Sequence, residues 1–324
     1  MSTALVTGAA GFLGRALVRE LLAGGHAVRA LVREGTDASG LDRRAEVLRG
    51  DATDPGALRR AVAGQDLVFH LAGVRRAAER DTFLRVNAGA TRLLLDACVA
   101  AGAARGRFVL AGSLAAAGPS CQGRTEDEPF QPVDWYGESK AEAERVALSF
   151  AGRLPVTVAR PPRIMGPGDR ENLLFFRIAS ARLVLRFLGP ERPLSWIDVD
   201  DCARGFALLA VHPAAPGQAF FLASRERTSV EGLQREVARA LGVRPRSVPV
   251  PPALLRALAA GADVVTRATG LKLPLNRKLA RQVLAPGWTC RTDKAERLRG
   301  VSASTPLSES VARAARSYRE LGWL

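Results

Sequence analysis

Short apolar segments alternate with helical patterns over the first 160 residues of the chain. Strands that are apolar at nearly every position are typical of a parallel sheet buried on both faces. We therefore expect a doubly wound α/β domain, with helices covering both faces of the sheet. The expected strands are 3–7, 27–33, 45–49, 67–71, 107–111 and 155–159. The expected helices are 12–23, 55–63, 82–101 and one that carries Tyr136 and Lys140 and ends near Phe150.

The regular alternation stops at about residue 160, where proline and glycine cluster at 161–162 and 166–168. Such clusters indicate loops. Helical patterns return near 199–211, 229–241, 252–268, 276–285 and 307–321. We predict a nucleotide-binding domain over 1–160. Residues 161–324 should mainly form a smaller substrate lobe over the carboxyl edge of the sheet, with some segments returning to the first domain.

A glycine-rich turn lies between the first expected strand and its helix. Gly8, Gly11 and Gly14 are spaced as in a dinucleotide-binding turn, where the backbone must bend sharply and approach a pyrophosphate closely. The anion then meets free N–H groups at the helix N-terminus. Because the motif sits inside a strand–helix–strand unit, it predicts a Rossmann-type NAD(P) site.

Two positions bear on which dinucleotide binds. An NAD site usually has a carboxylate at the end of the second strand, whereas this chain has Arg33, and arginine suits a 2′-phosphate. This favours NADP(H), with NAD(H) still possible; Arg33 could also be one more exposed arginine. Asp51 and Ala52 follow the third strand, where an adenine amine would lie. Asp51 could equally cap the following turn.

A tyrosine and a lysine four residues apart, Tyr136 and Lys140, share one face of the expected helix. An ammonium near a phenol favours the phenolate, which makes tyrosine usable as an acid and base near neutrality. The pair alone is common and could be a half-buried ring beside a solvated amine. Ser113, just after the strand 107–111, makes the combination more specific.

Composition narrows the classes of partner. The 324 residues are 47% apolar and carry a net charge of +15, but only four of the 47 basic residues are lysines, and the arginines are spread along the chain. A diffuse basic surface attracts anionic ligands or membranes without indicating nucleic acid binding. The four cysteines show no metal or disulfide spacing. Without a recognisable leader or a membrane-length apolar run, we expect a cytoplasmic protein that binds no metal.

The motifs together resemble the extended short-chain dehydrogenase/reductase superfamily, of the NAD-dependent epimerase/dehydratase type, over nearly the whole chain. They look most like 3β-hydroxysteroid dehydrogenases and dihydroflavonol reductases. The matching segments are TGAAGFLG at 7–14, GDATD at 50–54, HLAG at 70–73, VN at 86–87, GSLAAAG at 112–118, YGESK at 136–140, RPPRIMGPGD at 160–169 and IDVDDCARG at 197–205.

This resemblance implies roles for individual residues. Ser113, Tyr136 and Lys140 would be catalytic, with Lys140 also holding the nicotinamide ribose, and Asn87 would be structural or a relay. The cofactor would contact Gly8, Gly11, Phe12, Leu13 and Gly14 at the pyrophosphate, Leu71, Ala72 and Gly73 at the ribose, and the backbone of Pro161, Arg163 and Ile164 at the nicotinamide. A homodimer through the helices 82–101 and 136–150 is also implied.

The expected reaction is reduction of a ketone or aldehyde, or oxidation of the alcohol, with Tyr136 exchanging the proton and Ser113 stabilising the oxyanion. A dehydratase is disfavoured because Leu114 and Ala115, rather than an acidic pair, follow Ser113. A nucleotide-sugar epimerase stays open, since Asn172 and Arg192 could grip a nucleotide. A non-catalytic NADP-binding regulator is the third possibility.

Three large residues are candidates for an apolar substrate wall: Trp135, Met165 and Trp196. They favour a hydrophobic carbonyl compound, although core packing is the commoner fate of such residues. The helix 252–268 is almost wholly apolar, with its three charged residues on one face. It either packs on the lobe with one solvent-exposed polar face, or forms a substrate lid or a peripheral membrane contact.

Overall fold

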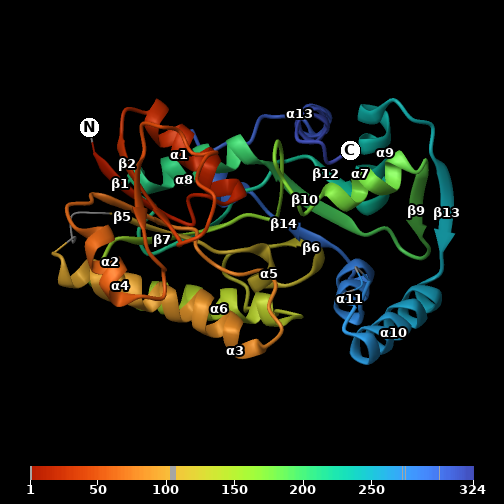
Figure 1. Ribbon diagram of the computed structural model, residues 1–324, viewed down its shortest axis with the longest axis horizontal. Coiled ribbons are helices and arrows are strands. Elements are labelled where there is room, and N and C mark those ends of the chain that lie inside the picture. The colour runs from red at the N-terminus through yellow and green to blue at the C-terminus, as the bar shows by residue number, and fades with distance from the viewer. Residues whose placement is uncertain (1, 103–106, 272, 274, 299) are drawn as a thin grey trace.

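The computed structural model describes residues 2–102, 107–271, 273, 275–298 and 300–324. Its main sheet has seven parallel strands in the order β11-β7-β5-β4-β1-β2-β3 (Figure 1). The strand order reverses at β1, and in such sheets ligands bind beyond the carboxyl ends of the strands at this point. The strands are β1 (Thr3–Thr7), β2 (Ala27–Val32), β3 (Glu46–Arg49), β4 (Leu67–His70), β5 (Arg107–Ala111), β7 (Val156–Arg160) and β11 (Ala219–Phe221).

Helices cover both faces of this sheet and bury a separate apolar cluster on each (Figure 1). On one face, α1 (Phe12–Ala23) packs against α8 (Val199–Val211). On the other face lie α2 (Pro55–Val62), α4 (Ala90–Ala100) and α6 (Trp135–Leu148). The predicted doubly wound parallel sheet is confirmed.

The break in the expected helix 82–101 was not predicted, whereas the return of later segments to this domain was predicted without naming the segments. The expected helix 82–101 is divided into α3 (Arg80–Phe83), a π-helical stretch (Leu84–Gly89) and α4. The seventh strand, β11, comes from beyond residue 160 and pairs with β7, and α8 also returns to the first core. In the opposite direction, β6 (Ser120–Arg124) leaves the first 160 residues to pair with β14 (Trp288–Cys290).

The second lobe contains a five-stranded sheet and a parallel two-stranded one. The larger has the order β12-β10-β14-β6, with β8 (Arg163–Met165) also paired to β10 (Pro193–Asp198), and β12 spans Arg227–Ser229. The smaller pairs β9 (Leu183–Phe187) with β13 (Arg246–Val250). The remaining helices of the described residues are α5 (Leu114–Ala117), which packs on α6, α12 (Asp293–Glu296), which packs on β11, and five others. These five are α7 (Leu173–Ser180), α9 (Val230–Leu241), α10 (Pro252–Thr269), α11 (Arg277–Leu284) and α13 (Leu307–Glu320).

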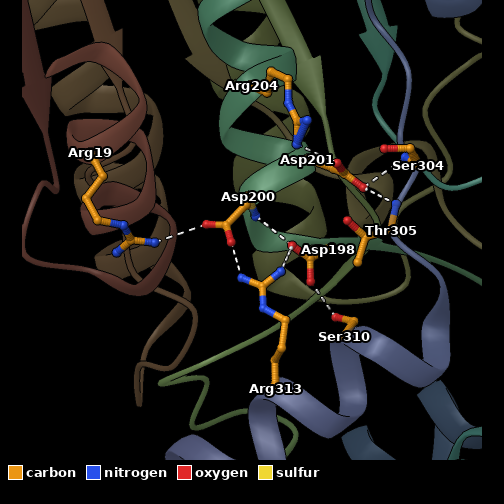
Figure 2. A network of polar contacts seen from close by, with 9 residues as sticks. All are labelled: Arg19, Asp198, Asp200, Asp201, Arg204, Ser304, Thr305, Ser310 and Arg313. Atoms are coloured by element: carbon orange, nitrogen blue, oxygen red, sulfur yellow. Dashed lines mark hydrogen bonds and ion pairs between the residues drawn. The ribbon is translucent and has the colours of Figure 1, made fainter. Parts of the chain in front are cut away.

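The aspartates of the segment IDVDD at 197–201 fix the last helix to the first domain (Figure 2). Asp198 accepts a hydrogen bond from Ser310 Oγ at 2.7 Å, and Asp200 pairs with both Arg19 of α1 and Arg313 of α13. Asp201 accepts backbone N–H groups from the segment that leads into α13. These aspartates therefore have a structural role in this chain.

Candidate active site

The glycine-rich turn follows β1 and has no room for larger residues. Gly8 has φ +69°, and a Cβ there would lie 2.7 Å from the backbone N of Ala72. A Cβ on Gly14 would overlap the carbonyl oxygen of Gly8. Gly11 is the N-cap residue of α1 and offers no side chain to the helix N–H groups, and Phe12 and Leu13 form the first turn. The turn can therefore present free N–H groups to a pyrophosphate.

The segment Leu71–Gly73 lies between this turn and the expected catalytic helix. Thr7 Oγ1 accepts a hydrogen bond from the backbone N–H of Ala72 at 3.2 Å and lies 2.7 Å from Nδ1 of His70. A Cβ on Gly73 would lie 3.7 Å from Nζ of Lys140. Of the predicted ribose-contacting residues, Gly73 thus lies beside the lysine ammonium, and Ala72 lies beside the glycine-rich turn.

Asn87 holds this segment against α6. Its Oδ1 accepts from the backbone N–H of Val74 at 2.8 Å, while its Nδ2 donates to the carbonyl of Val74 and to Ser139 Oγ. Ser139 in turn donates to the carbonyl of Tyr136 at 2.8 Å. The π-helical stretch that contains Asn87 therefore positions the first turn of α6.

Tyr136 and Ser113 come from different elements and reach the same cavity. Asp134 caps α6 by accepting from the N–H of Gly137, which fixes the helix start just before Tyr136. Gly137 lies so close to the carbonyl of Ala115 that a Cβ would overlap it, and this lets α6 approach α5. Ser113 is the N-cap residue of α5 and accepts from Ala115 N–H at 3.1 Å.

Lys140 lies one turn beyond Tyr136 and is buried behind the cavity wall. Its Nζ donates to the carbonyl of Ala111 at 2.7 Å, at the end of β5. Burial and then the Lys140 charge lower the pKa of nearby His70 to about 3, so His70 is neutral at physiological pH. Of these two groups, only Lys140 carries a charge, and His70 is a structural hydrogen-bond partner of Thr7.

A buried ion pair lies beneath Ser113. Glu144, one turn beyond Lys140 on α6, accepts from Nε of Arg160 at 2.7 Å, and both side chains are at most 4% exposed. A Cβ on Gly112 would lie 2.5 Å from Oε1 of Glu144, so the carboxylate faces the Gly112–Ser113 backbone. Burial raises the pKa of Glu144, while the charges of Arg160 and Lys140 oppose this shift. Sequence analysis did not single out Glu144.

The cavity that Ser113 and Tyr136 border has a volume of about 520 Å³, within the usual range for small-molecule sites. Most of its wall is apolar and belongs to the second lobe, but Arg75, Arg163 and Arg192 also border it. The guanidinium of Arg75 lies 5.7 Å from the ring centroid of Tyr136. The apolar wall includes Leu174, Phe175, Leu255, Leu258, Leu279 and Trp288.

The three residues predicted for the apolar wall lie elsewhere, so this part of the prediction is corrected. Trp135 is 45% exposed at the start of α6, and Met165 and Trp196 are at most 1% exposed in the core between α7, α9 and α13. These two fill space among the helices of the second lobe. The tryptophan on the cavity wall is Trp288, whose Nε1 donates to the carbonyl of Gln282 at 2.9 Å.

The segment after β7 borders the cavity near Ser113. The carbonyl of Pro161 accepts from the N–H of Leu114 at 3.1 Å, which joins this segment to the serine loop. Ile164 and Arg163 line the cavity. The guanidinium of Arg163 donates to Asn172 Oδ1 at 2.5 Å. Burial lowers the pKa of Arg163. Asn172 also donates to the carbonyl of Ile164, so its amide is engaged within the protein.

The residues expected at the adenosine end lie together beyond β2 and β3. Arg33 is exposed directly after β2. Asp51 accepts from both the N–H and the Oγ1 of Thr53, and these bonds, with the charges of Arg33 and Arg85, lower the pKa of Asp51. Asp51 thus caps the turn that contains Ala52, and adenine binding by these two residues stays a prediction.

Sequence reasoning also missed Arg75, Phe175 and Trp288 on the cavity wall. No local motif distinguishes them, because their position depends on how the second lobe folds over the sheet edge. Among the described residues, no group of three or more His, Cys, Asp or Glu is arranged to hold a metal ion.

Comparison with known proteins identifies the family of the chain. The profile of the NAD-dependent epimerase/dehydratase family matches residues 4–223. The chain is 31% identical to the ceramide reductase of Caulobacter vibrioides, over 98% of this chain and 95% of that protein. It is 33% identical to a 3β-hydroxysteroid dehydrogenase/Δ5→4-isomerase of Mycobacterium tuberculosis, over 74% of this chain and 70% of that protein.

Among solved structures, a dTDP-glucose 4,6-dehydratase from Streptomyces venezuelae with bound NAD is similar with a TM-score of 0.79 and 25% identity. The match covers 99% of this chain and 98% of that one. The predicted resemblance is therefore confirmed, and so is the prediction that the protein is an NAD(P)-dependent enzyme. The chain belongs to the NAD-dependent epimerase/dehydratase family of extended short-chain dehydrogenases/reductases.

Proposed function

We propose that this enzyme reduces a ketone or aldehyde group of a hydrophobic small molecule, or oxidises the corresponding alcohol. The observation that carries this proposal is that Ser113 and Tyr136 open onto a largely apolar cavity. Lys140 lies one helical turn from Tyr136 and beside the ribose-binding segment. Similarity to a ceramide reductase and a 3β-hydroxysteroid dehydrogenase supports a lipophilic substrate.

The residues present fit a dinucleotide. The turn at Gly8–Gly14 excludes side chains, and α1 begins without a side-chain cap, so the pyrophosphate would lie there. Leu71–Gly73 and Lys140 would hold the nicotinamide ribose, and the Pro161–Ile164 segment would border the ring. When bound, the nicotinamide supplies or accepts a hydride.

The protein's own groups would then handle the oxygen and its proton. Tyr136 donates a proton to the substrate oxygen during reduction and takes it back in the reverse direction. Ser113 donates a hydrogen bond to the same oxygen and stabilises its developing negative charge. The Lys140 ammonium lies one helical turn from Tyr136 on the same face of α6. The apolar wall excludes water and orients the rest of the substrate.

NADP(H) is the favoured cofactor in this proposal, with NAD(H) as the alternative. Arg33 is exposed at the end of β2, where a 2′-phosphate on the adenosine ribose would lie. Arginine binds phosphate through paired N–H groups, which an unphosphorylated ribose does not engage.

A nucleotide-sugar epimerase is the second candidate, because Arg75, Arg163 and Arg192 border the cavity. Against it, Asn172 is bound to Arg163 and Ile164, and Arg192 donates to the carbonyls of Phe187 and Pro190. These groups are therefore occupied within the protein. A non-catalytic NADP-binding regulator would need no intact Ser113, Tyr136 and Lys140 set.

A substrate panel tests the proposal. The purified enzyme with NADPH or NADH is offered steroid, fatty and aromatic ketones, and UDP-sugars are tested for epimerisation in parallel. We expect cofactor oxidation with one or more apolar ketones, no epimerisation, and loss of turnover in Tyr136→Phe. Epimerisation without ketone reduction would favour the second candidate, and cofactor binding without any turnover would favour the regulator.

The homodimer and the cytoplasmic location stay predictions. Light scattering after size exclusion would test the first, with charge substitutions on the outer surfaces of α4 and α6 as the matched variants. No helix within the described parts of the chain is long and apolar enough to cross a membrane.

A further inference from the structure

Helix α10 turns an apolar face to solvent along its whole length. Leu254, Leu258, Val264 and Val265 are 47%, 53%, 61% and 44% exposed. A surface helix of a globular protein normally points such residues toward the core and polar residues outward. We define the outer face of α10 as the exposed residues Leu254, Ala257, Leu258, Gly261, Val264, Val265 and Ala268.

These positions form one continuous stripe. At about 100° per residue, they occupy a sector of about 120° on an α-helix, and an 18-residue helix is about 27 Å long. Leu255 and Ala259 face the opposite way, into a small core shared with Ala280 of α11. Arg256 and Arg267 lie on a third side, about 60–80° beyond Val264. The helix therefore has separate buried, charged and exposed apolar sides.

The outer face is continuous with the substrate cavity. Leu255 and Leu258 of α10 line the cavity, as do Leu279 and Val283 of α11. Leu258 is also 53% exposed, so one side chain belongs both to the cavity wall and to the outer surface. Figure 1 shows α10 and α11 side by side at the end of the second lobe, away from β1 and the glycine-rich turn.

The charge around this face suits an anionic surface. The described residues within 252–284 include five basic ones, Arg256, Arg267, Arg277, Lys278 and Arg281, and one acidic one. The chain as a whole has a net charge of +15. The acidic residue, Asp263, is paired with Arg277 at 3.7 Å. A basic helix with an exposed apolar side is the usual composition of helices that lie in a membrane interface. Basic residues near an anionic leaflet add to the binding free energy.

We propose that the outer face of α10 docks the enzyme on the surface of anionic phospholipid membranes and places the cavity mouth against the lipid. A second copy of this chain fits the face less well, because the arginines beside it, Arg256 and Arg267, would face those of the other copy. The docking depends on the surface alone and does not require the proposed reaction.

Vesicle co-sedimentation tests the proposal. The double variant Leu254→Glu/Val265→Glu charges the outer face without touching a cavity-lining residue. The control Val47→Glu/Val211→Glu charges residues that are 42% and 54% exposed on β3 and α8. With phosphatidylglycerol/phosphatidylcholine vesicles, we expect the wild type to bind and the α10 variant to bind at least tenfold more weakly. The control should stay within twofold of the wild type, and all three should reduce a water-soluble ketone equally.

Three results would overturn the proposal. The first is a wild type that does not bind the anionic vesicles, and the second is an α10 variant that binds them as well as the wild type. The third is a wild-type dimer in light scattering that the α10 variant dissociates, since this would assign the face to self-association. If no ketone is turned over by any of the proteins, the proposed reaction fails while the vesicle result still decides the docking.

Discussion

The buried pair of Glu144 and Arg160 allows a quantitative prediction. Their side chains are 0% and 4% exposed, and 2.7 Å separates Oε2 from Nε. Removing one member of such a pair leaves an uncompensated buried charge, which costs about 3–5 kcal/mol. Because domains are stable by only about 5–15 kcal/mol, Glu144→Gln should lose about a fifth or more of the free energy of unfolding.

Urea unfolding followed by circular dichroism measures this loss. The matched control is Glu142→Gln on the same helix, whose partner Arg145 is 57% exposed, and it should change the free energy of unfolding by less than about 1 kcal/mol. The double variant Glu144→Met/Arg160→Met removes both charges and should recover most of the stability. The reasoning is refuted if Glu144→Gln costs no more than Glu142→Gln, or if the double variant is as unstable as the sum of its single substitutions.

Three further predictions concern the cofactor site. Gly8→Ala should lose at least about 1–2 kcal/mol of stability and bind cofactor at least tenfold more weakly, because φ is +69° and a Cβ would clash with Ala72. The control Gly25→Ala has φ +79° and open space around the added Cβ. It should therefore lose similar stability, but a cofactor titration should show the affinity of the wild type. Arg33→Ala should raise the KM for NADPH about 10–100-fold and leave that for NADH nearly unchanged, whereas equal effects on both would exclude a 2′-phosphate contact. In the folded protein the pKa of His70 is lowered from 6.5 to about 3. Between pH 6.5 and pH 3, His70 therefore binds a proton in the unfolded chain but not in the folded protein, and the free energy of unfolding falls as the pH falls below 6.5. Between pH 8 and pH 5, the free energy of unfolding in urea should fall by about 2 kcal/mol more for the wild type than for His70→Gln. Equal falls in the two proteins would contradict the burial argument.

Local patterns were sufficient for much of the nucleotide-binding domain. The strand Thr3–Thr7 and the helix Phe12–Ala23 were predicted with the bounds that the structure has. The glycine-rich turn separates the two elements, and Gly24 and Gly25 end the helix. The order of strands along the chain follows from the same alternation. Ser113 follows the parallel strand β5, and Tyr136 lies in the first turn of α6, the helix that precedes the parallel strand β7. Both could therefore be expected at the same edge of the sheet, where they border one cavity.

Long-range packing explains what the sequence left out. The strand Ala219–Phe221 has only three residues and exists because β7 offers it an edge. The cavity wall depends on which helices of the second lobe lie over the sheet, so Trp288 and Trp196 could not be told apart by their neighbours. One borders the cavity and the other is 0% exposed in a core.

Single-turnover oxidation of enzyme-bound NADPH by a reducible apolar ketone, compared between the wild type and Tyr136→Phe, tests the proton-transfer role most directly. A positioned acid contributes about 10²–10⁴-fold to such a step. The account predicts a fall of this size in Tyr136→Phe, with cofactor affinity within about threefold of the wild type because Lys140, Gly73 and the glycine-rich turn are unchanged. A Tyr136→Phe enzyme that binds cofactor normally and oxidises it within tenfold of the wild-type rate would contradict the account.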